Sequence, residues 1–175
     1  FNIISCNHYV SPWKRFPTIT DSQLSYSIPS RNGNVSEAYD LILNLYADGG
    51  TDINGALIAA INLANDVKKN KEIGSGTQQM IVFLTDGEPT EGETSGTKIK
   101  DNIKQYNSAS KIPIFCLAFG DGADFNLLKD ISIENRGFAQ KISESGNSFE
   151  QLEDFYNGIS GKHERKYIQM KMIDT

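Results

Sequence analysis

Cysteine and histidine are scarce in this chain, and long apolar runs are missing. Two cysteines in 175 residues are too few for a disulfide scaffold. Cys6 and Cys116 each lie in an apolar run, so we expect two buried free thiols that are not bonded to each other. No run approaches the ~20 apolar residues that a membrane-spanning helix needs. The sequence therefore indicates neither a disulfide framework nor a membrane span.

Signals for catalysis and for nucleic-acid binding are also missing. The histidines, His8 and His163, follow a predicted strand and lie in a charged tail, where we expect solvated or structural roles. No G-x-S-x-G segment, the nucleophile elbow of α/β hydrolases, occurs. The formal net charge of −5 lacks the basic footprint that phosphate binding needs. We therefore expect a protein that is not an enzyme and does not bind nucleic acid.

The remaining composition is that of an ordinary globular domain. Hydrophobic residues make up 38% and charged residues 22% of the chain. A chain of this length predicts one domain with a substantial core. The first residue is Phe and no signal peptide precedes it, so we expect a fragment or a processed product.

Short apolar strands alternate with amphipathic helices, which is typical of an α/β fold with a parallel sheet. Met80–Thr85 and Ile112–Phe119 are almost continuously apolar and predict strands covered on both faces. Asn34 and Glu37 have the spacing of a capping box and predict a helix start. Further strands are predicted at 1–5, 24–28 and 138–142, with a long turn between the first two. Helices are predicted at 34–45, 52–67, 99–106, 125–133 and 149–159.

Oxygen-bearing side chains gather where ligands bind in such folds, at the carboxyl ends of the strands. Thr85-Asp86-Gly87 follows a predicted strand, and Gly49-Gly50-Thr51-Asp52 leads into a predicted helix. Hydroxyls and carboxylates are the ligands that Mg²⁺ and Ca²⁺ prefer. Spacing alone leaves other roles open: Thr51 or Asp52 would serve equally as an N-cap, and Asp86-Gly87 as an ordinary turn.

Two of these segments resemble a known family. Ile81–Gly87 is similar to the strand and Thr-Asp-Gly motif of von Willebrand A domains, and Gly49–Leu57 is similar to their Gly-Gly-Thr-(Asn/Asp)-Ile segment. More narrowly, Asp86–Glu93 (DGEPTEGE) and Glu134–Gln140 (ENRGFAQ) resemble the heavy chains of inter-alpha-trypsin inhibitor. The resemblance covers about residues 1–160, and we expect 161–175 to be a charged tail that leads into a following region.

The resemblance implies a doubly wound α/β fold, with helices on both faces of a mostly parallel six-stranded sheet. It also implies a metal-ion-dependent adhesion site with a D-x-S-x-S loop after the first strand. Thr51 and Asp86 match the family's other two ligand positions. No D-x-S-x-S occurs here, and Asp21–Ser25 (DSQLS) has the wrong spacing. We therefore expect a partial metal site, with the family's first strand and helix lying upstream of Phe1.

By the same resemblance, the intact domain binds Mg²⁺ or Ca²⁺ and, through it, an acidic side chain of a protein partner. The heavy chains are secreted and associate with hyaluronan-rich matrix and with an inhibitor light chain. Asn34-Val35-Ser36 is the single N-x-S/T sequon, so we expect Asn34 to be glycosylated if the chain is secreted.

Two other interpretations are kept. An A-type domain that has lost its metal would act as a scaffold, with Thr51 and Asp86 serving only as caps. A nucleotide-binding enzyme would use Gly120–Phe125, which follows a strand as G-x-G-x-x-G does. There, however, Phe125 stands in place of the third glycine, and Asp121 and Asp124 would repel a pyrophosphate.

Overall fold

The computed structural model describes residues 1–7, 9–13, 16–18, 21–25, 28, 30, 32–45, 49–143 and 146–161. His8, His163 and the whole of 162–175 lie outside the described residues, so the predictions made for the histidines and the tail are untested. In the described part no helix is long and apolar enough to cross a membrane.

Strands and helices alternate along most of the chain. In chain order they are β1 (Ile4–Cys6), β2 (Val10–Pro12), β3 (Phe16–Thr18), β4 (Asp21–Ser25), α1 (Asn32–Leu43), α2 (Ile53–Lys69), β5 (Ile81–Thr85), α3 (Gly96–Asn107), β6 (Ile114–Phe119), α4 (Phe125–Glu134), β7 (Ala139–Ile142) and α5 (Ser148–Ile159).

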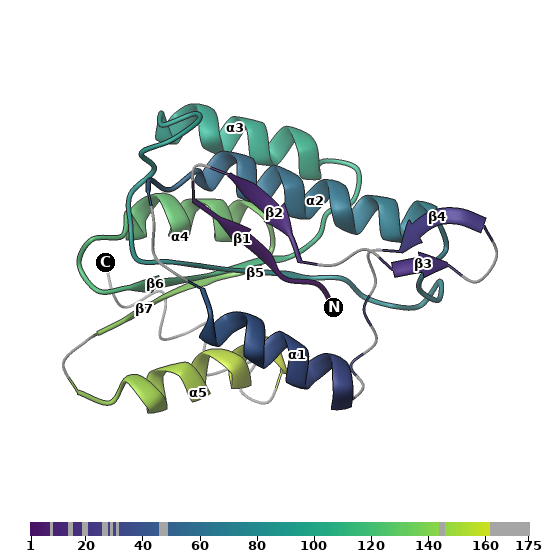
Figure 1. Ribbon diagram of the computed structural model, residues 1–175. Helices are drawn as coiled ribbons and strands as arrows, with labels where there is room; N and C mark the ends of the chain where they lie inside the picture. The colour runs from purple at the N-terminus through teal and green to yellow at the C-terminus, as the bar shows by residue number, and fades with distance from the viewer. Residues whose placement is uncertain are drawn as a thin grey trace.

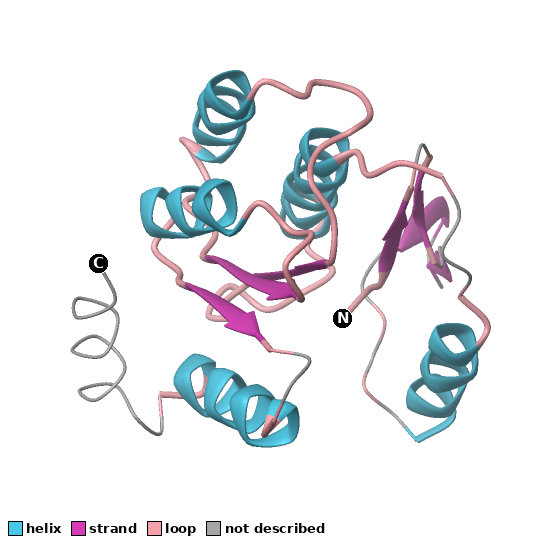
Figure 2. Ribbon diagram, turned by 90° about the vertical axis from the view of Figure 1, so that its left-hand side faces the viewer, coloured by secondary structure: helices cyan, strands magenta, loops and turns pink. Residues whose placement is uncertain are grey.

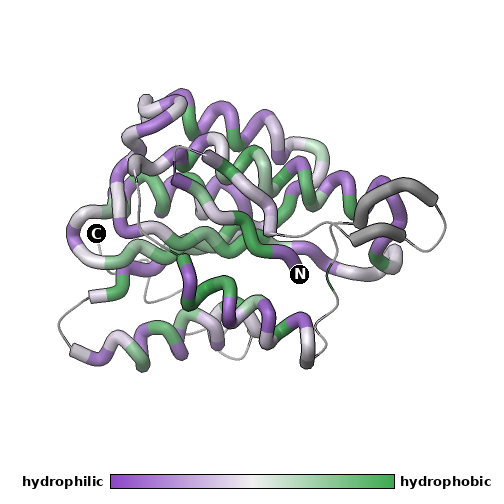
Figure 3. The backbone as a smooth tube through the Cα atoms, in the orientation of Figure 1, coloured by the Kyte–Doolittle hydropathy of each residue, from purple (hydrophilic) through white to green (hydrophobic). Residues whose placement is uncertain are grey.

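The centre of the fold is a three-stranded parallel sheet in the order β5-β6-β7. Ile81 pairs with Ile114, and Cys116 pairs with Ala139. Helices α2, α3 and α4 lie on one side of this sheet, and α1 and α5 lie on the other (Figure 1). Figure 3 shows that the sheet strands are the most continuously hydrophobic part of the trace. The predicted doubly wound α/β fold is confirmed.

The main core lies between the sheet and α2, α3 and α4. The helix predicted at 52–67 is confirmed as α2, and its residues Ile53, Leu57 and Ile61 have no exposed surface. A smaller cluster on the other face joins Leu117 and Ile142 to Phe155 of α5. Burial of these side chains, at roughly 1.5–3 kcal/mol each, is the main force that holds the helices on the sheet.

The first 30 residues differ from the sequence prediction. The segment predicted as a long turn contains β2 and β3, which pair antiparallel with β1 and β4. The strand predicted at 24–28 ends at Ser25, and Ile28 is buried outside any strand, with its N–H donating to the Phe1 carbonyl. Neighbouring segments pair in these two ribbons, and edge strands tolerate the prolines that argued against strands here.

The first helix also differs from its prediction. α1 begins at Asn32, so Asn34 lies inside the helix and does not cap it. Ala38 is buried, but Ile42 and Leu45, two apolar residues of the helix predicted at 34–45, are 53% and 48% exposed. Most of the apolar stripe of α1 is therefore exposed among the described residues.

Three further apolar side chains predicted to be in the core are at the surface. Met80 and Leu84 are 56% and 47% exposed, so β5 is not covered on both faces. Tyr106 is 47% exposed, and Asn107 is buried in its place at the end of α3. The Asn107 side chain bonds the N–H and the carbonyl of Ile112, each at 2.8 Å, which explains why an amide is buried there.

Both cysteines are free, and they lie in different sheets. Cys116 of β6 is fully buried, whereas Cys6 of β1 is only partly buried, short of the full burial predicted for it. Burial, and secondly the nearby Asp52 carboxylate, raise the pKa of the Cys6 thiol.

Candidate functional site

Asp52, and not Thr51, caps the start of α2. Asp52 Oδ1 accepts a hydrogen bond of 2.7 Å from the backbone N–H of Gly55, which is N-cap geometry. The backbone N–H of Asp52 donates to the Asn7 carbonyl at 3.3 Å, so the turn after β1 reaches the same place. The cap is therefore made without the Thr51 hydroxyl.

The turn that carries Asp86 is shaped by Thr85 at the end of β5. Thr85 is buried, and its Oγ1 accepts a hydrogen bond of 3.2 Å from the N–H of Gly87. Asp86, between these two residues, is exposed. On its other side the loop after β6 passes closely, because a Cβ on Gly122 would lie 2.7 Å from the Asp86 carbonyl oxygen. The sequence thus places the Asp86 carboxylate at the carboxyl end of the sheet.

The structure brings the two predicted metal ligands to neighbouring loops. Thr51 Oγ1 lies 3.1 Å from the position that a Cβ on Gly87 would occupy, and Gly87 adjoins Asp86. The backbone of Thr51 is also bonded to Thr90, in the loop that follows Asp86. A hydroxyl and a carboxylate therefore share one edge of the sheet.

These two donors suit a divalent cation in kind but are few in number. Mg²⁺ takes six oxygen ligands in near-octahedral geometry, and Ca²⁺ takes six to eight. Among the described residues, no group of three or more His, Cys, Asp or Glu side chains would hold a metal ion. Thr51 and Asp86 would occupy two positions, and the rest of the shell would come from water or from ligands outside this sequence.

Both carboxylates of the loop after β6 have partners within the protein. Asp121 Oδ1 accepts a hydrogen bond of 2.6 Å from Lys141 Nζ, which lowers the pKa of the Asp121 carboxyl. Asp124 caps α4, accepting from the Leu127 N–H at 3.0 Å. A carboxylate thus fills the helix start at which a nucleotide-binding loop would take a phosphate.

Sequence reasoning missed two side chains of the DGEPTEGE segment. Glu93 accepts a hydrogen bond of 2.9 Å from the backbone N–H of Ser95, and this bond is the main reason that the pKa of Glu93 is lowered. Ser95 makes no side-chain cap of its own, so Glu93 stabilises the start of α3. Thr90 contacts Thr51, as described below. Polar residues with turn preference were the available signal for Glu93, whose partner is two positions away, whereas the partner of Thr90 is 39 positions away.

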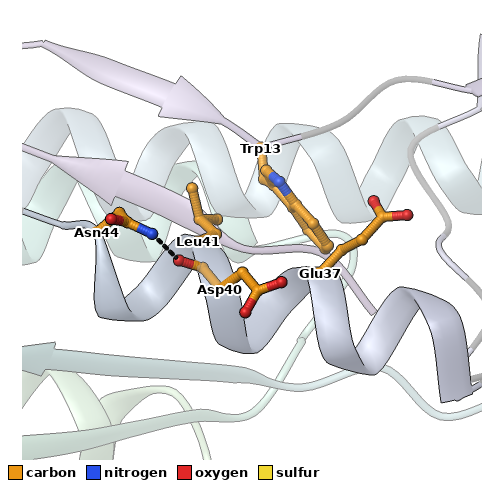
Figure 4. Close-up of a pocket in the computed structure, with 5 residues that line it drawn as sticks. All are labelled: Trp13, Glu37, Asp40, Leu41 and Asn44. Carbon is orange, nitrogen blue, oxygen red and sulfur yellow. Dashed lines mark hydrogen bonds between the residues drawn. The ribbon is translucent and has the colours of Figure 1, made fainter.

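The proposed glycosylation site and the best-defined pocket both lie on α1. Asn34 is partly exposed within the first turns of that helix, and its glycosylation stays a prediction. The pocket is shallow, about 360 Å³, and lies between Trp13 and Glu37, Asp40, Leu41 and Asn44 (Figure 4). Asn44 Nδ2 donates to the Asp40 carbonyl at 2.7 Å. Helix α1, which contributes Glu37, Asp40 and Leu41 to the lining, lies on the opposite side of the central sheet from α2 (Figure 1).

Comparison with known proteins identifies the family of the chain. The sequence profile of the von Willebrand factor type A domain matches residues 21–157. The chain belongs to the von Willebrand factor type A domain family. It is 41% identical over 164 residues to inter-alpha-trypsin inhibitor heavy chain H6 of Homo sapiens, covering 91% of this chain and 12% of that protein. It is 32% identical over 160 residues to heavy chain H4 of Bos taurus, covering 91% and 16%.

A solved structure shares the fold. The von Willebrand factor type A protein from Catenulispora acidiphila superposes with a TM-score of 0.62 at 17% identity, covering 89% of this chain and 32% of that one. The predicted family and the narrower resemblance to the heavy chains are both confirmed. The chain spans only a small part of the length of those heavy chains.

Proposed function

We propose that this A-type domain is a binding module without catalytic activity, which holds a partner through a divalent cation. The main support is that the Thr51 loop and the Asp86 loop are bonded to each other at the carboxyl edge of the sheet. An ion held there by few protein charges keeps an electrophilic position. An acidic side chain of a protein partner would fill that position without any bond being made or broken.

We propose that residues 1–160 form this domain, that 161–175 lead into a following region, and that one further strand lies between β1 and β5. Helix α2 contacts β1, β2 and β5, so one helix covers both sheets, although the described strands β1 and β5 are not paired with each other. Figure 2 shows these two sheets apart, and α1 and α5 apart on the side away from α2. We propose that the helix expected to accompany this strand lies between α1 and α5, because both carry exposed apolar side chains. These side chains are Val35, Tyr39, Ile42, Leu43, Phe149 and Tyr156.

The hydrogen-bond pattern indicates which backbone groups such a strand would pair. The Ile81 N–H donates to the Pro113 carbonyl, so the backbone N–H and carbonyl groups of the odd-numbered residues of β5 point toward β6. Those of Val82 and Leu84 point to the other edge of β5. The Ile3 carbonyl accepts from the Trp13 N–H, so the backbone groups of Ile4 and Cys6 in β1 point away from β2. We expect fast hydrogen exchange at Val82 and Leu84 in this chain and slow exchange at both in the full-length protein. Fast exchange at both in the full-length protein would contradict the additional strand.

Titration with Mg²⁺ tests the metal site. We expect the full-length protein to bind the ion and the 175-residue chain to bind it weakly or not at all, because two protein groups leave Mg²⁺ close to aqueous. Asp86→Asn in the full-length protein should lower the affinity at least tenfold, whereas Asp66→Asn, an exposed change on α2, should not. Equal affinity of the two wild-type chains would mean that the site is misplaced. Absence of binding in both would favour the scaffold interpretation.

The wider biology is proposed from the relatives, whose names describe inhibitor heavy chains. We propose a secreted protein that associates with hyaluronan-rich matrix and with an inhibitor light chain, and that carries a glycan on Asn34. Expression in a secretory host tests this: the protein should appear in the medium, be retained on immobilised hyaluronan, and shift in mobility after N-glycosidase treatment. No shift would contradict the glycan alone.

A further inference from the structure

The loop that follows Asp86 hydrogen-bonds to both backbone groups of Thr51, and we call this set of three bonds the grip. The Thr51 N–H donates to Thr90 Oγ1 at 2.8 Å. The Thr51 carbonyl accepts from the N–H groups of Thr90 and Glu91, at 3.1 and 3.3 Å. Thr90 is therefore donor and acceptor to a residue 39 positions earlier in the chain, and the two loops are held in one relative position.

Two glycines allow this close approach. A Cβ on Gly50 would lie 2.4 Å from Glu91 Cγ and 2.6 Å from Thr90 Oγ1. A Cβ on Gly92 would lie 2.6 Å from Asp52 Oδ1, and Gly92 has a φ of +66°, a conformation that other residues rarely adopt. Side chains at either position would separate the loops, so the sequence is adapted to keep them in contact.

The grip holds Thr51 beside the turn that carries Asp86. Thr51 is bonded through its backbone to Thr90, and its hydroxyl faces Gly87 in the turn that carries Asp86. Thr90 and Asp86 belong to the same loop, so movement of Thr51 relative to Asp86 requires either that the bonds to Thr90 break or that residues 87–89 between them change conformation. The Thr90 hydroxyl makes one of the three bonds that hold this geometry.

We propose that Thr90 is a positioning residue, whose hydroxyl fixes Thr51 at the distance from Asp86 that a shared cation requires. This role rests on the proposed function, because it concerns the same two ligands. Thr90 contacts the backbone of Thr51 and is not itself offered as a ligand. The role predicts that the geometry is set before any ion binds.

Thr90→Val tests the role, because valine keeps the branched shape and the backbone N–H but removes the acceptor oxygen. In the metal-free 175-residue chain, amide exchange at Thr51 should accelerate about three- to tenfold, the range of one net hydrogen bond. Thr90→Ser retains the acceptor and should exchange like wild type. Thr97→Val, a matched exposed change in α3, should leave Thr51 unaffected.

The second measurement is the Mg²⁺ affinity of the full-length protein. Thr90→Val should weaken it several-fold while lowering the thermal midpoint of the metal-free protein by no more than about 4 °C, as loss of one hydrogen bond would, and Thr90→Ser should restore it. Unchanged Thr51 exchange in Thr90→Val would overturn the grip, and unchanged Mg²⁺ affinity would overturn the positioning role. A wild type that binds no Mg²⁺ overturns the proposed function and this role together, while the exchange result still reports on the grip.

Discussion

Helices α2 and α1 have similar apolar patterns but very different surroundings. α2 buries Ile53, Ala56, Leu57, Ile61 and Val67 beneath the loops and strands of the main core. α1 buries only Ala38 among its described hydrophobic residues, and Tyr39 and Leu43 are 63% and 64% exposed. An apolar stripe therefore predicts a helix in both places, but burial depends on whether a second surface is present to cover it.

The sharpest test of this comparison is the same substitution in the two regions. A Cβ on Gly137 would lie 1.8 Å from the Ile114 carbonyl oxygen, so Gly137→Ala forces β6 and the end of α4 apart. We expect a loss beyond about 3 kcal/mol in the free energy of unfolding. Gly33→Ala in α1 meets no atom within 4 Å and should stabilise by about 0.5–1 kcal/mol. Urea denaturation measures the free energy of unfolding of both variants. Equal changes would show that the two regions do not differ in how tightly they are packed.

Truncation of isoleucine is the second test. Ile61→Ala should cost about 3 kcal/mol, because Ile61 is fully buried and its loss leaves a cavity in the main core. Ile42→Ala should change the free energy of unfolding by less than about 0.5 kcal/mol, because Ile42 is half exposed. A large loss for Ile42→Ala in thermal melts would show that α1 is covered after all.

The buried amides at the amino end of the sheet give the third test. Asn107 Nδ2 donates at 2.8 Å to Asn135 Oδ1 as well as to Ile112. Asn107→Ala leaves the Ile112 backbone groups without these partners, so we expect a loss of about 2 kcal/mol. Asn44→Ala, in the turn just after α1, removes one exposed bond and should cost under about 0.5 kcal/mol. Equal losses in urea denaturation would show that burial does not decide the cost.

The smallest expected effect concerns thiol reactivity. Burial and the Asp52 carboxylate raise the pKa of Cys6, so its reactive thiolate is scarce near pH 8 and alkylation should be slow. Asp52→Asn removes the charge and keeps a capping side chain, so Cys6 should react modestly faster. Cys116, fully buried, should stay unreactive in both proteins. Mass spectrometry of the alkylated peptides measures these rates, and faster reaction at Cys116 than at Cys6 would contradict the burial order.

Much of the fold from α2 onward was predictable from local pattern. The apolar pattern of α2 and the apolar runs of β5 and β6 predicted elements whose ends agree with the structure to within a few residues. The errors fall where pairing depends on neighbouring chain, as at β2 and β3, or where apolar residues lack a partner surface, as at Leu84. Thr51 and Asp86 were selected because they match two ligand positions of the family; spacing alone left an N-cap and an ordinary turn open, and their role as ligands stays a prediction.

The sequence by itself determined the α/β alternation, the family and the two candidate ligands, because periodicity and short motifs are local properties of the chain. The bonds of Asp52 to Gly55 and of Glu93 to Ser95 are local, and the structure only chose among options that the sequence left open there. Only the tertiary structure decided that Thr90 bonds Thr51. The Thr90 bond joins residues 39 positions apart. Hydrogen-bond partners at that separation are chosen by how the sheet and helices pack, which no local pattern records.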